Sequence, residues 1–274
     1  MVVQHNLQAT NANRMLGGNV KAVAKNTEKL SSGYRVNRAA DDAAGLSISE
    51  KMRNQIRGIN QAVSNAEDGQ YLIQTAEGNM NEIHSVLQRM GELATKAAND
   101  VNATEDREAI ANEIDQLRQE IDSIANKAQF NGTKLLDGNM SKGKYLQVGA
   151  NSGENMIVAI DKLTASGIGL TVDSTKVSSH SLASTTMSNI TNAIKLVSAQ
   201  RSKLGAIQNR LDYTINNLEN YSENLTASES SIRDTDMAKE MVAYSKNNIL
   251  QQAAQSMLAQ ANQSTQGVMS LLQG

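Results

Sequence analysis

Adjacent carboxylates are the first residues of this sequence whose types could do chemistry. Asp41 and Asp42 follow two cations, Arg35 and Arg38. A carboxylate pair can act as general acid and general base in hydrolysis. No nucleophilic side chain accompanies this pair, however, and the carboxylates lie beside cations in a loop bounded by glycines. The pattern therefore favours a turn-stabilising ion cluster over a catalytic centre.

Histidines and glycines offer no better candidate for a metal or nucleotide site. His5, His84 and His180 are scattered along the chain and lack the His-Glu-x-x-His spacing of zinc enzymes. Gly33 and Gly45 bracket the loop that holds the carboxylates, but no phosphate-binding pattern surrounds them. Their conformational freedom explains them better. We predict no catalytic residue, no metal ligand and no cofactor.

Composition excludes further classes of protein. The 274 residues include no Cys, which rules out disulfides, zinc-thiolate sites and thiol catalysis. The net charge is −2 with both signs interspersed, so no basic stripe for nucleic acid exists. No apolar run approaches the roughly 20 residues of a membrane span, and no signal peptide is expected. Pro is absent, so long helices can run unbroken.

Heptad spacing is the strongest structural signal, and it predicts a long coiled-coil-like helix from Ser47 to Asn99. Such a helix would be on the order of 80 Å long, which indicates a rod rather than a globule. The apolar positions that define it are Met52, Ile56, Ile59, Val63, Ala66, Ile73, Ala76, Met80, Ile83, Leu87, Met90, Ala94 and Ala97.

Two further segments repeat this pattern. One runs from Ile110 to Ala128 after a polar loop in which Thr104 can cap the helix. The other runs from Met187 to Ile232, with interruptions at Arg201 and Ser222. Between them, about 130–180 is rich in Gly, Asn and Ser, and residues 144–148 and 156–160 flank a Gly-containing turn. We predict a small β-hairpin there.

Both chain ends are nearly free of charge. Asn247 to Gly274 contains no charged residue, and only His5 could carry charge between Met1 and Asn13. An exposed helix rarely contains so few charged residues. A disordered tail is one interpretation, and a segment that folds on association is the other. The residues through which we expect the tail to act are Ile249, Leu250, Met257, Leu258, Val268, Leu271 and Leu272.

Three motifs resemble the signatures of bacterial flagellins. Residues 30–45 read LSSGYRVNRAADDAAG and resemble the N-terminal signature, while residues 204–211 (LGAIQNRL) and 223–227 (ENLTA) are similar to the C-terminal one. The likeness extends over about 5–140 and 185–274. It implies a mainly α subunit of a motility filament, exported unfolded through the flagellar type III apparatus to the cell exterior, with a short outward-facing middle.

The resemblance also implies domains and partners. Residues 1–44 and 232–274 would pair as a terminal helical core that forms on filament assembly, and 45–231 would form the helical rod domain with its short β region. Expected partners are further copies of the chain, an export chaperone that holds the uncharged tail, and the filament cap and hook-junction proteins.

Residues 87–96 (LQRMGELATK) resemble the patch through which Toll-like receptor 5 senses many flagellins. Two positions depart from the family pattern, because Gly91 stands where Arg is usual and Lys96 where Gln is usual. The alternative is that these are ordinary solvated charges on a packing surface. The residues expected to contact the receptor are Gln88, Arg89, Glu92, Leu93 and Glu113.

Two rival functions come from other classes. A hook-filament junction protein shares the paired terminal helices, although the intact motif that begins at Leu204 favours flagellin. An enzyme embedded in the middle region would need a catalytic constellation between Phe130 and His180, and the sequence provides none. We therefore predict a structural subunit.

Overall fold

The computed structural model describes the backbone of residues 6–273 and the side chains of residues 6–173 and 175–264. The chain divides into two compact units, which are described separately: unit 1 comprises 1–54 and 224–274, and unit 2 comprises 55–223. The elements are α1 (Leu7–Ser32), α2 (Ala43–Ala97), α3 (Thr104–Lys127), β1 (Gln129–Phe130), β2 (Thr133–Lys134), β3 (Lys144–Gln147), β4 (Asn155–Val158), the short helix η1 (Asp173–Thr175), α4 (His180–Arg233) and α5 (Met237–Gln273).

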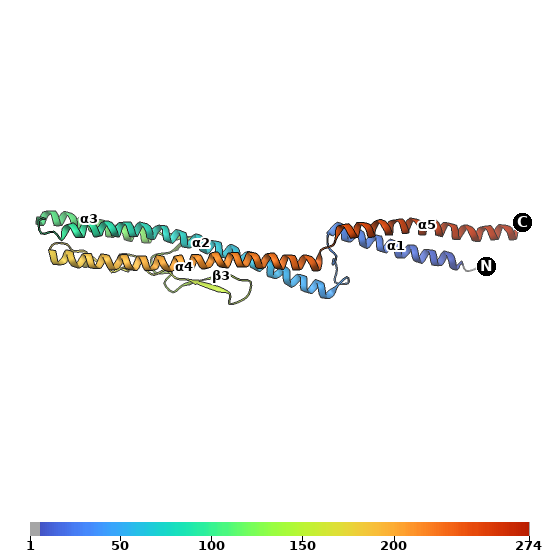
Figure 1. Cartoon of the computed structure of the whole chain (residues 1–274), viewed down its shortest axis with the longest axis horizontal. Coiled ribbons are helices and arrows are strands. Elements are labelled where there is room, and N and C mark those ends of the chain that lie inside the picture. The colour runs from blue at the N-terminus through green and yellow to red at the C-terminus, as the bar shows by residue number, and fades with distance from the viewer. Residues whose placement is uncertain (1–5, 274) are drawn as a thin grey trace. The chain divides into compact units, whose positions relative to one another are not determined.

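Unit 2 contains a continuous core between α2, α3 and α4, which run side by side (Figure 1). The predicted heptad helices are confirmed, because apolar heptad positions of all three between Ala66 and Ile215 pack in this core. Burying each large aliphatic side chain contributes about 1.5–3 kcal/mol. The fully buried members include Ile73, Met80, Ile83, Leu87 and Met90 from α2, Ile114 and Ile121 from α3, and Val197, Leu204 and Leu211 from α4.

The polar interruptions predicted in the third heptad segment do not break α4. Arg201 forms an ion pair with Glu77 of α2, with 3.4 Å between nitrogen and oxygen. Ser222 of α4 donates a hydrogen bond of 2.9 Å to Asn60 of α2. Polar pairs therefore link α4 to α2 at these two levels, where the apolar repeat is interrupted.

The predicted hairpin is confirmed as an antiparallel pair of β3 and β4, in which Tyr145 is opposite Ile157. Gly153 in the intervening turn has a φ of 93°, a conformation that other residues rarely adopt. A second, two-residue hairpin, β1 with β2, precedes it. Gln200, buried in α4, donates a hydrogen bond of 3.0 Å to the carbonyl of Ala159, which anchors the chain just after β4.

Close packing of the hairpin turn on α2 requires Gly58. A Cβ at this position would lie 2.8 Å from the Cβ of Ala150, which cannot rotate away. We expect Gly58→Ala to lower the free energy of unfolding by about 1–3 kcal/mol through overpacking. Gly78→Ala in the same helix is the matched control, because a Cβ there meets no atom within 4 Å. It should raise stability by up to about 1 kcal/mol.

Urea denaturation of both variants tests this pair. A Gly58→Ala chain that is as stable as the Gly78→Ala chain would contradict the close approach of the turn to α2.

The start of α3 corrects one expectation. Thr104 is the first residue of the helix, and Ala103 occupies the cap position. The carboxylate of Asp106 accepts a hydrogen bond of 3.1 Å from the backbone N–H of Ala103. A carboxylate in the first helical turn also interacts favourably with the helix dipole. The cap is therefore supplied from inside the helix rather than by Thr104.

Unit 1 pairs the two ends of the chain. Helices α1 and α5 lie side by side and antiparallel (Figure 1). Asn6 donates a hydrogen bond of 3.0 Å to the carbonyl of Ala261 at one end of the pair. At the other end, Lys29 lies 3.7 Å from the carboxylate of Glu240. The two terminal helices are thus paired within one chain.

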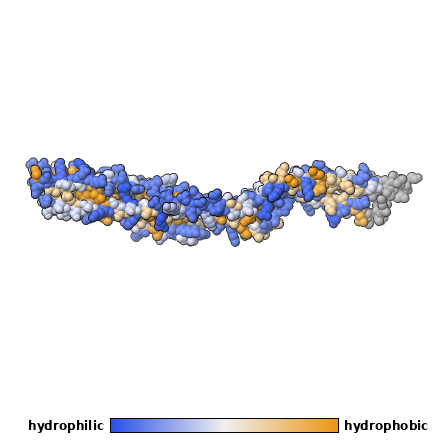
Figure 2. Space-filling view, viewed as in Figure 1, coloured by the Kyte–Doolittle hydropathy of each residue, from blue (hydrophilic) through white to orange (hydrophobic). Residues whose placement is uncertain are grey.

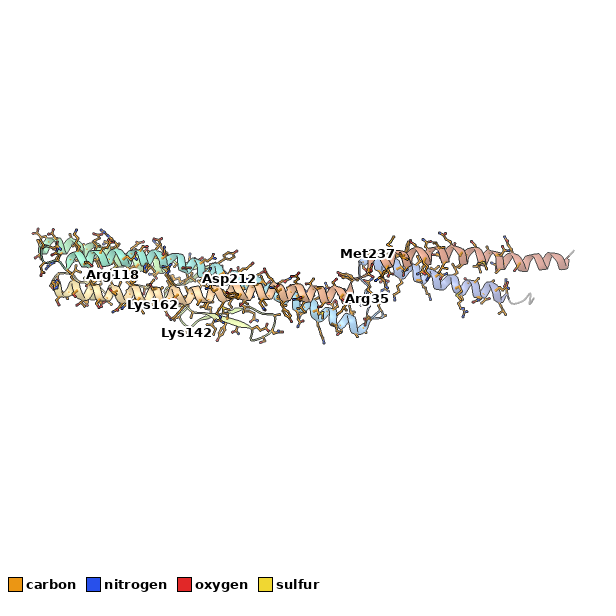
Figure 3. The ribbon with its side chains drawn as sticks, in the orientation of Figure 1. Arg35, Arg118, Lys142, Lys162, Asp212 and Met237 are labelled. Atoms are coloured by element: carbon orange, nitrogen blue, oxygen red, sulfur yellow. The ribbon has the colours of Figure 1, made fainter. Side chains whose placement is uncertain are left out.

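Two connecting segments, 33–42 and 234–236, lie together in unit 1, where the N–H of Thr235 donates a hydrogen bond of 2.9 Å to the carbonyl of Gly33. Figure 3 labels Arg35 in the first segment and Met237 directly after the second. Tyr34 and Asp234 form an antiparallel β-bridge. The guanidinium of Arg233 lies 4.6 Å from the centre of the Tyr34 ring and donates a hydrogen bond of 2.9 Å to Glu50. These contacts join residues nearly 200 positions apart, and no pattern in the sequence predicted them.

Candidate functional site

The predicted tail residues lie on α5, and several expose large apolar side chains. Ile249 is 66% exposed, Leu250 42% and Met257 64%, whereas Leu258 is partly buried. The side chains of Val268, Leu271 and Leu272 lie outside the described residues. Figure 2 shows hydrophobic residues at the surface of the α1–α5 pair. The tail is thus a helix with an apolar surface that unit 1 does not cover.

Helix α1 contributes exposed apolar residues that the sequence analysis did not single out. Leu7, Met15 and Val20 are all at least 43% exposed. Only Leu7 belongs to the uncharged stretch 1–13, and Met15 and Val20 lie beyond it. Helical spacing alone does not tell which side of a helix a neighbour covers. The candidate site therefore comprises both helices rather than the C-terminal tail alone.

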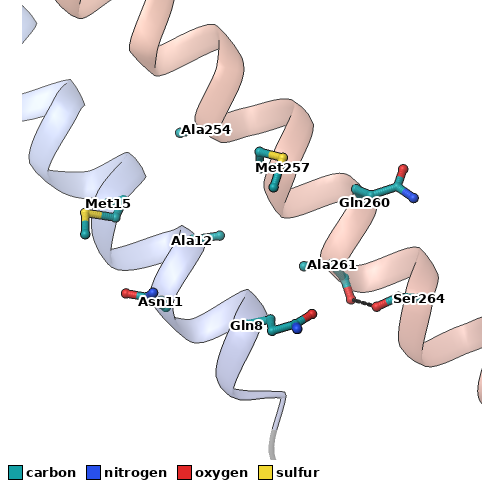
Figure 4. Close-up of a pocket in the computed structure, with 9 residues that line it drawn as sticks. All are labelled: Gln8, Asn11, Ala12, Met15, Ala254, Met257, Gln260, Ala261 and Ser264. Atoms are coloured by element: carbon teal, nitrogen blue, oxygen red, sulfur yellow. Dashed lines mark hydrogen bonds between the residues drawn. The ribbon is translucent and has the colours of Figure 1, made fainter. Parts of the chain in front are cut away.

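An apolar groove of about 470 Å³ runs between α1 and α5 (Figure 4). Ala12 and Met257 point toward the space between the helices. None of the nine lining residues carries a charge. They are Gln8, Asn11, Ala12, Met15, Ala254, Met257, Gln260, Ala261 and Ser264.

The pair has almost no interior of its own. Within the described parts of α1 and α5, the only buried residue is the polar Asn26. Its side-chain nitrogen is buried without a hydrogen-bond partner. Because an unpaired buried amide is destabilising, Asn26 weakens a helix pair that already lacks a dry core. The arrangement is suited to association with further apolar surface.

The predicted receptor patch lies on the exposed sides of α2 and α3, which the structure brings together. Arg89 forms ion pairs with Glu113 of α3 at 3.0 Å and with Glu92 at 3.1 Å. Hydrogen bonds to Glu113 and Glu92 raise the pKa of the Arg89 guanidinium. Gln88 is exposed and lies 3.2 Å from a ring nitrogen of His84.

Leu93 differs from the other four patch residues. It is only 4% exposed and packs in the core of unit 2, although it lies one helical turn from Arg89. The accessible part of the patch is therefore polar, and Leu93 supports it from beneath. A Cβ at Gly91 would meet only the side chain of Ile190, at 3.8 Å, which is an ordinary van der Waals contact.

The adjacent carboxylates Asp41 and Asp42 have partners that stabilise the turn. Lys25, rather than Arg35 or Arg38, pairs with Asp41 at 2.8 Å. This hydrogen bond holds the pKa of the Asp41 carboxyl below its usual value, so it stays ionised. Asp42 accepts a hydrogen bond of 2.8 Å from the N–H of Gly45 and thereby caps α2. Both carboxylates stabilise the turn.

Gly33 and Gly45 serve different purposes. Gly33 ends α1 with a φ of 75°, as its predicted conformational freedom required. Gly45 has no such φ, and that expectation was wrong for it. Instead, a Cβ at Gly45 would collide with the Asp42 carboxylate that caps the helix. Space, rather than φ, demands glycine at this position.

Neither a metal site nor a membrane span emerges from the described residues. No three His, Asp or Glu side chains among them gather as ion ligands. None of the described helices has an apolar window long enough to cross a bilayer.

Two family models match the sequence. The bacterial flagellin N-terminal helical region matches residues 3–141, and the bacterial flagellin C-terminal helical region matches residues 187–272. A flagellin of Halalkalibacterium halodurans is 52% identical over 272 residues, which cover 99% of this chain and all of that protein. A flagellin of Bacillus subtilis is 46% identical, with 99% and 100% covered. The 31.3 kDa flagellar filament core protein of Treponema maltophilum is 45% identical over the full length of both.

Solved structures agree with these matches. The crystal structure of Bacillus cereus flagellin is 33% identical and aligns with a TM-score of 0.50 over 57% of this chain and 88% of that one. A putative flagellar hook-associated protein from Vibrio parahaemolyticus aligns with a TM-score of 0.61 over 71% of this chain and all of that one. Its identity of 15% shows a shared fold alone.

The family models cover both helical regions and the near-full-length relatives are flagellins, whereas the hook-associated protein shares only the fold. The chain is therefore a structural filament subunit and not an enzyme, and it belongs to the bacterial flagellin family.

Proposed function

We propose that the chain joins its filament through α1 and α5, whose uncovered apolar surface is buried against neighbouring copies. The observation that carries this proposal is the exposure of Ile249, Leu250 and Met257 in a stretch without charge. Burial of apolar area is worth roughly 25 cal/mol per Å², and no ammonium or carboxylate of this stretch has to be desolvated. Residues 1–44 and 232–274 would then become fully ordered on assembly.

Export is the second part of the proposal. The chain leaves the cell unfolded through the flagellar type III apparatus and reaches the exterior. A cytoplasmic chaperone covers α5 beforehand, because an apolar helix of this kind self-associates when left bare. The cap and hook-junction proteins meet the same terminal helices at the two ends of the filament.

A single charge in α5 tests the assembly surface. We expect Met257→Lys and Leu258→Asp to block filament growth, since each places an unpaired ion in an apolar contact. The far-ultraviolet circular dichroism of the monomer should stay nearly unchanged. Val172→Lys is the matched control, because Val172 is 59% exposed in the outward-facing middle region. Normal filaments from either α5 variant in negative-stain micrographs would show that the tail is a solvated appendage.

We also propose that the exposed patch on α2 and α3 is a ligand of Toll-like receptor 5. The proposal is supported by the accessible side chains of Gln88, Arg89, Glu92 and Glu113, with Leu93 beneath them. The ion pairs of Arg89 with the two glutamates hold its guanidinium on the surface of unit 2.

Receptor signalling is expected to fall when Arg89 is replaced by Ala and to rise in Gly91→Arg. An arginine at Gly91 adds a second cation to the patch and removes a helix-weakening glycine, which costs about 1 kcal/mol relative to Ala. Gly91→Ala separates these effects, because it restores helix propensity without charge. A reporter-cell assay with purified monomers compares the variants. Equal signalling by wild type, Gly91→Arg and Arg89→Ala would remove the patch from the proposal.

A further inference from the structure

Methionines are distributed unequally between solvent and core in this chain. Met80 and Met90 are fully buried in unit 2. Met15 is 56% exposed and Met257 64%, and both line the groove between α1 and α5 (Figure 4). The thioether sulfur is oxidised readily when solvent and oxidant reach it. The groove thus combines two accessible sulfurs with the surface that is proposed to assemble.

We propose that Met15 and Met257 are sites of reversible oxidation by a peroxide, and that sulfoxide at these positions prevents an unassembled chain from joining a filament. The inference rests on the proposed assembly function. Its first half, selective oxidation, follows from exposure alone and does not depend on assembly.

The reaction is a two-electron oxygen transfer. A lone pair of the thioether sulfur attacks one peroxide oxygen, so that an S–O bond forms while the O–O bond breaks. The departing hydroxide takes up the proton of the attacked oxygen and leaves as water when hydrogen peroxide is the oxidant. Sulfur is oxidised and the peroxide is reduced. Sulfoxide reductases, one for each sulfur epimer, restore the thioether. A dithiol supplies the two electrons and is oxidised to a disulfide, and the oxygen leaves as water.

The sulfoxide is much more polar than the thioether, whereas the groove is largely apolar. Methionine is an adaptable apolar side chain, whereas its sulfoxide carries a strong hydrogen-bond acceptor on sulfur. Ala12, Ala254 and Ala261 line the same groove as the two methionines. A neighbouring copy that covers these alanines would bury the S–O group, and burial of an acceptor without a partner opposes association.

Peptide mapping by mass spectrometry tests the first half. The purified full-length monomer is treated with hydrogen peroxide until about one sulfoxide per chain has formed. We expect Met15 and Met257 to be oxidised at least tenfold faster than Met80 and Met90, which serve as internal controls. Equal rates at the four positions would overturn the assignment, because they would mean that the groove is covered or that the core is open.

Elongation of preformed filament seeds tests the second half. Wild-type monomer treated until peptide mapping shows sulfoxide at both Met15 and Met257 should elongate at least tenfold more slowly than untreated monomer. The two epimer-specific sulfoxide reductases, supplied with a dithiol, should restore the rate. Two double variants separate the groove from other exposed sulfurs: Met15→Leu with Met257→Leu, and Met237→Leu with Met241→Leu. Met237 and Met241 are 47% and 50% exposed on α5 but do not line the groove.

Each variant is compared with its own untreated rate. The groove variant should lose its sensitivity to peroxide, and the Met237/Met241 variant should keep it. The reverse pattern, or equal sensitivity of both variants, would overturn the inference. Failure of untreated wild-type monomer to elongate would instead contradict the proposed assembly function, whereas a normal untreated rate with a peroxide-insensitive wild type contradicts only the role of oxidation.

Discussion

Deletion of Asn247 to Gly274 is expected to abolish filament growth while the chain stays soluble and largely helical. The core of unit 2 consists of residues between Ala66 and Ile215, so the deletion removes none of it. It removes Ile249, Leu250 and Met257, which carry exposed apolar surface of α5. Each Å² of apolar surface that α5 no longer buries against neighbouring copies loses roughly 25 cal/mol of favourable free energy. The remaining contacts between subunits are then too weak to hold the filament together.

Circular dichroism and seeded elongation followed by electron microscopy measure the two outcomes on the same preparation. The truncated chain should also be exported poorly, because the proposed chaperone loses its target. The same assays on Val172→Lys show whether the preparation is competent to elongate. Filaments from the truncated chain would refute the assignment of assembly to α5.

Amide protons of α5 in the isolated monomer are expected to exchange faster than those of α2 by roughly three orders of magnitude. Ile83 is fully buried in a core that all three helices of unit 2 share, whereas Leu250 and Met257 are exposed. Ordering each backbone residue costs about 1–2 kcal/mol, and α1 and α5 bury little apolar surface in return. Limited proteolysis should accordingly leave a resistant fragment of about 45–231.

Hydrogen exchange followed by mass spectrometry compares protection in α5 and in α2 in a single sample. Ile83 of α2 serves as the internal reference for Leu250 and Met257. Assembled filaments provide the second state, in which protection at Leu250 should approach that at Ile83. Protection at Leu250 or Met257 in the monomer that already equals protection at Ile83 would mean that the terminal pair folds alone. The proposed coupling of order to assembly would then be wrong.

Local patterns in the sequence were sufficient for the architecture of unit 2. A heptad repeat that runs from Met52 to Ala97 specifies a long helix, because its period matches the helical turn. The predicted bounds 47–99 differ from those of α2 (Ala43–Ala97) by a few residues at each end. The hairpin of β3 and β4 was predictable for the same reason, since both strands and their turn lie within 15 residues.

The ends of local elements were less predictable, because a cap depends on individual side-chain geometry. Thr104 was expected to cap α3, but Asp106 does so from the first turn. Gly45 was expected to supply φ freedom, whereas it makes room for the Asp42 carboxylate. In both cases the helix cap is a hydrogen bond between a carboxylate and a backbone N–H three positions away. Several nearby side chains could have formed such a bond, so the sequence does not say which one does.

By itself, the sequence determined that this protein is a long helical subunit with an uncharged C-terminal stretch, because helix periodicity and charge are local properties of the chain. Only the tertiary structure decided that Leu93 lies in the core beneath Arg89, that Lys25 rather than Arg38 pairs with Asp41, and that Tyr34 meets Asp234. It also placed Met15 and Met257 beside one groove. Each of these facts depends on which surfaces of separate elements meet, and that choice is made by the packing of the whole unit rather than by any single segment.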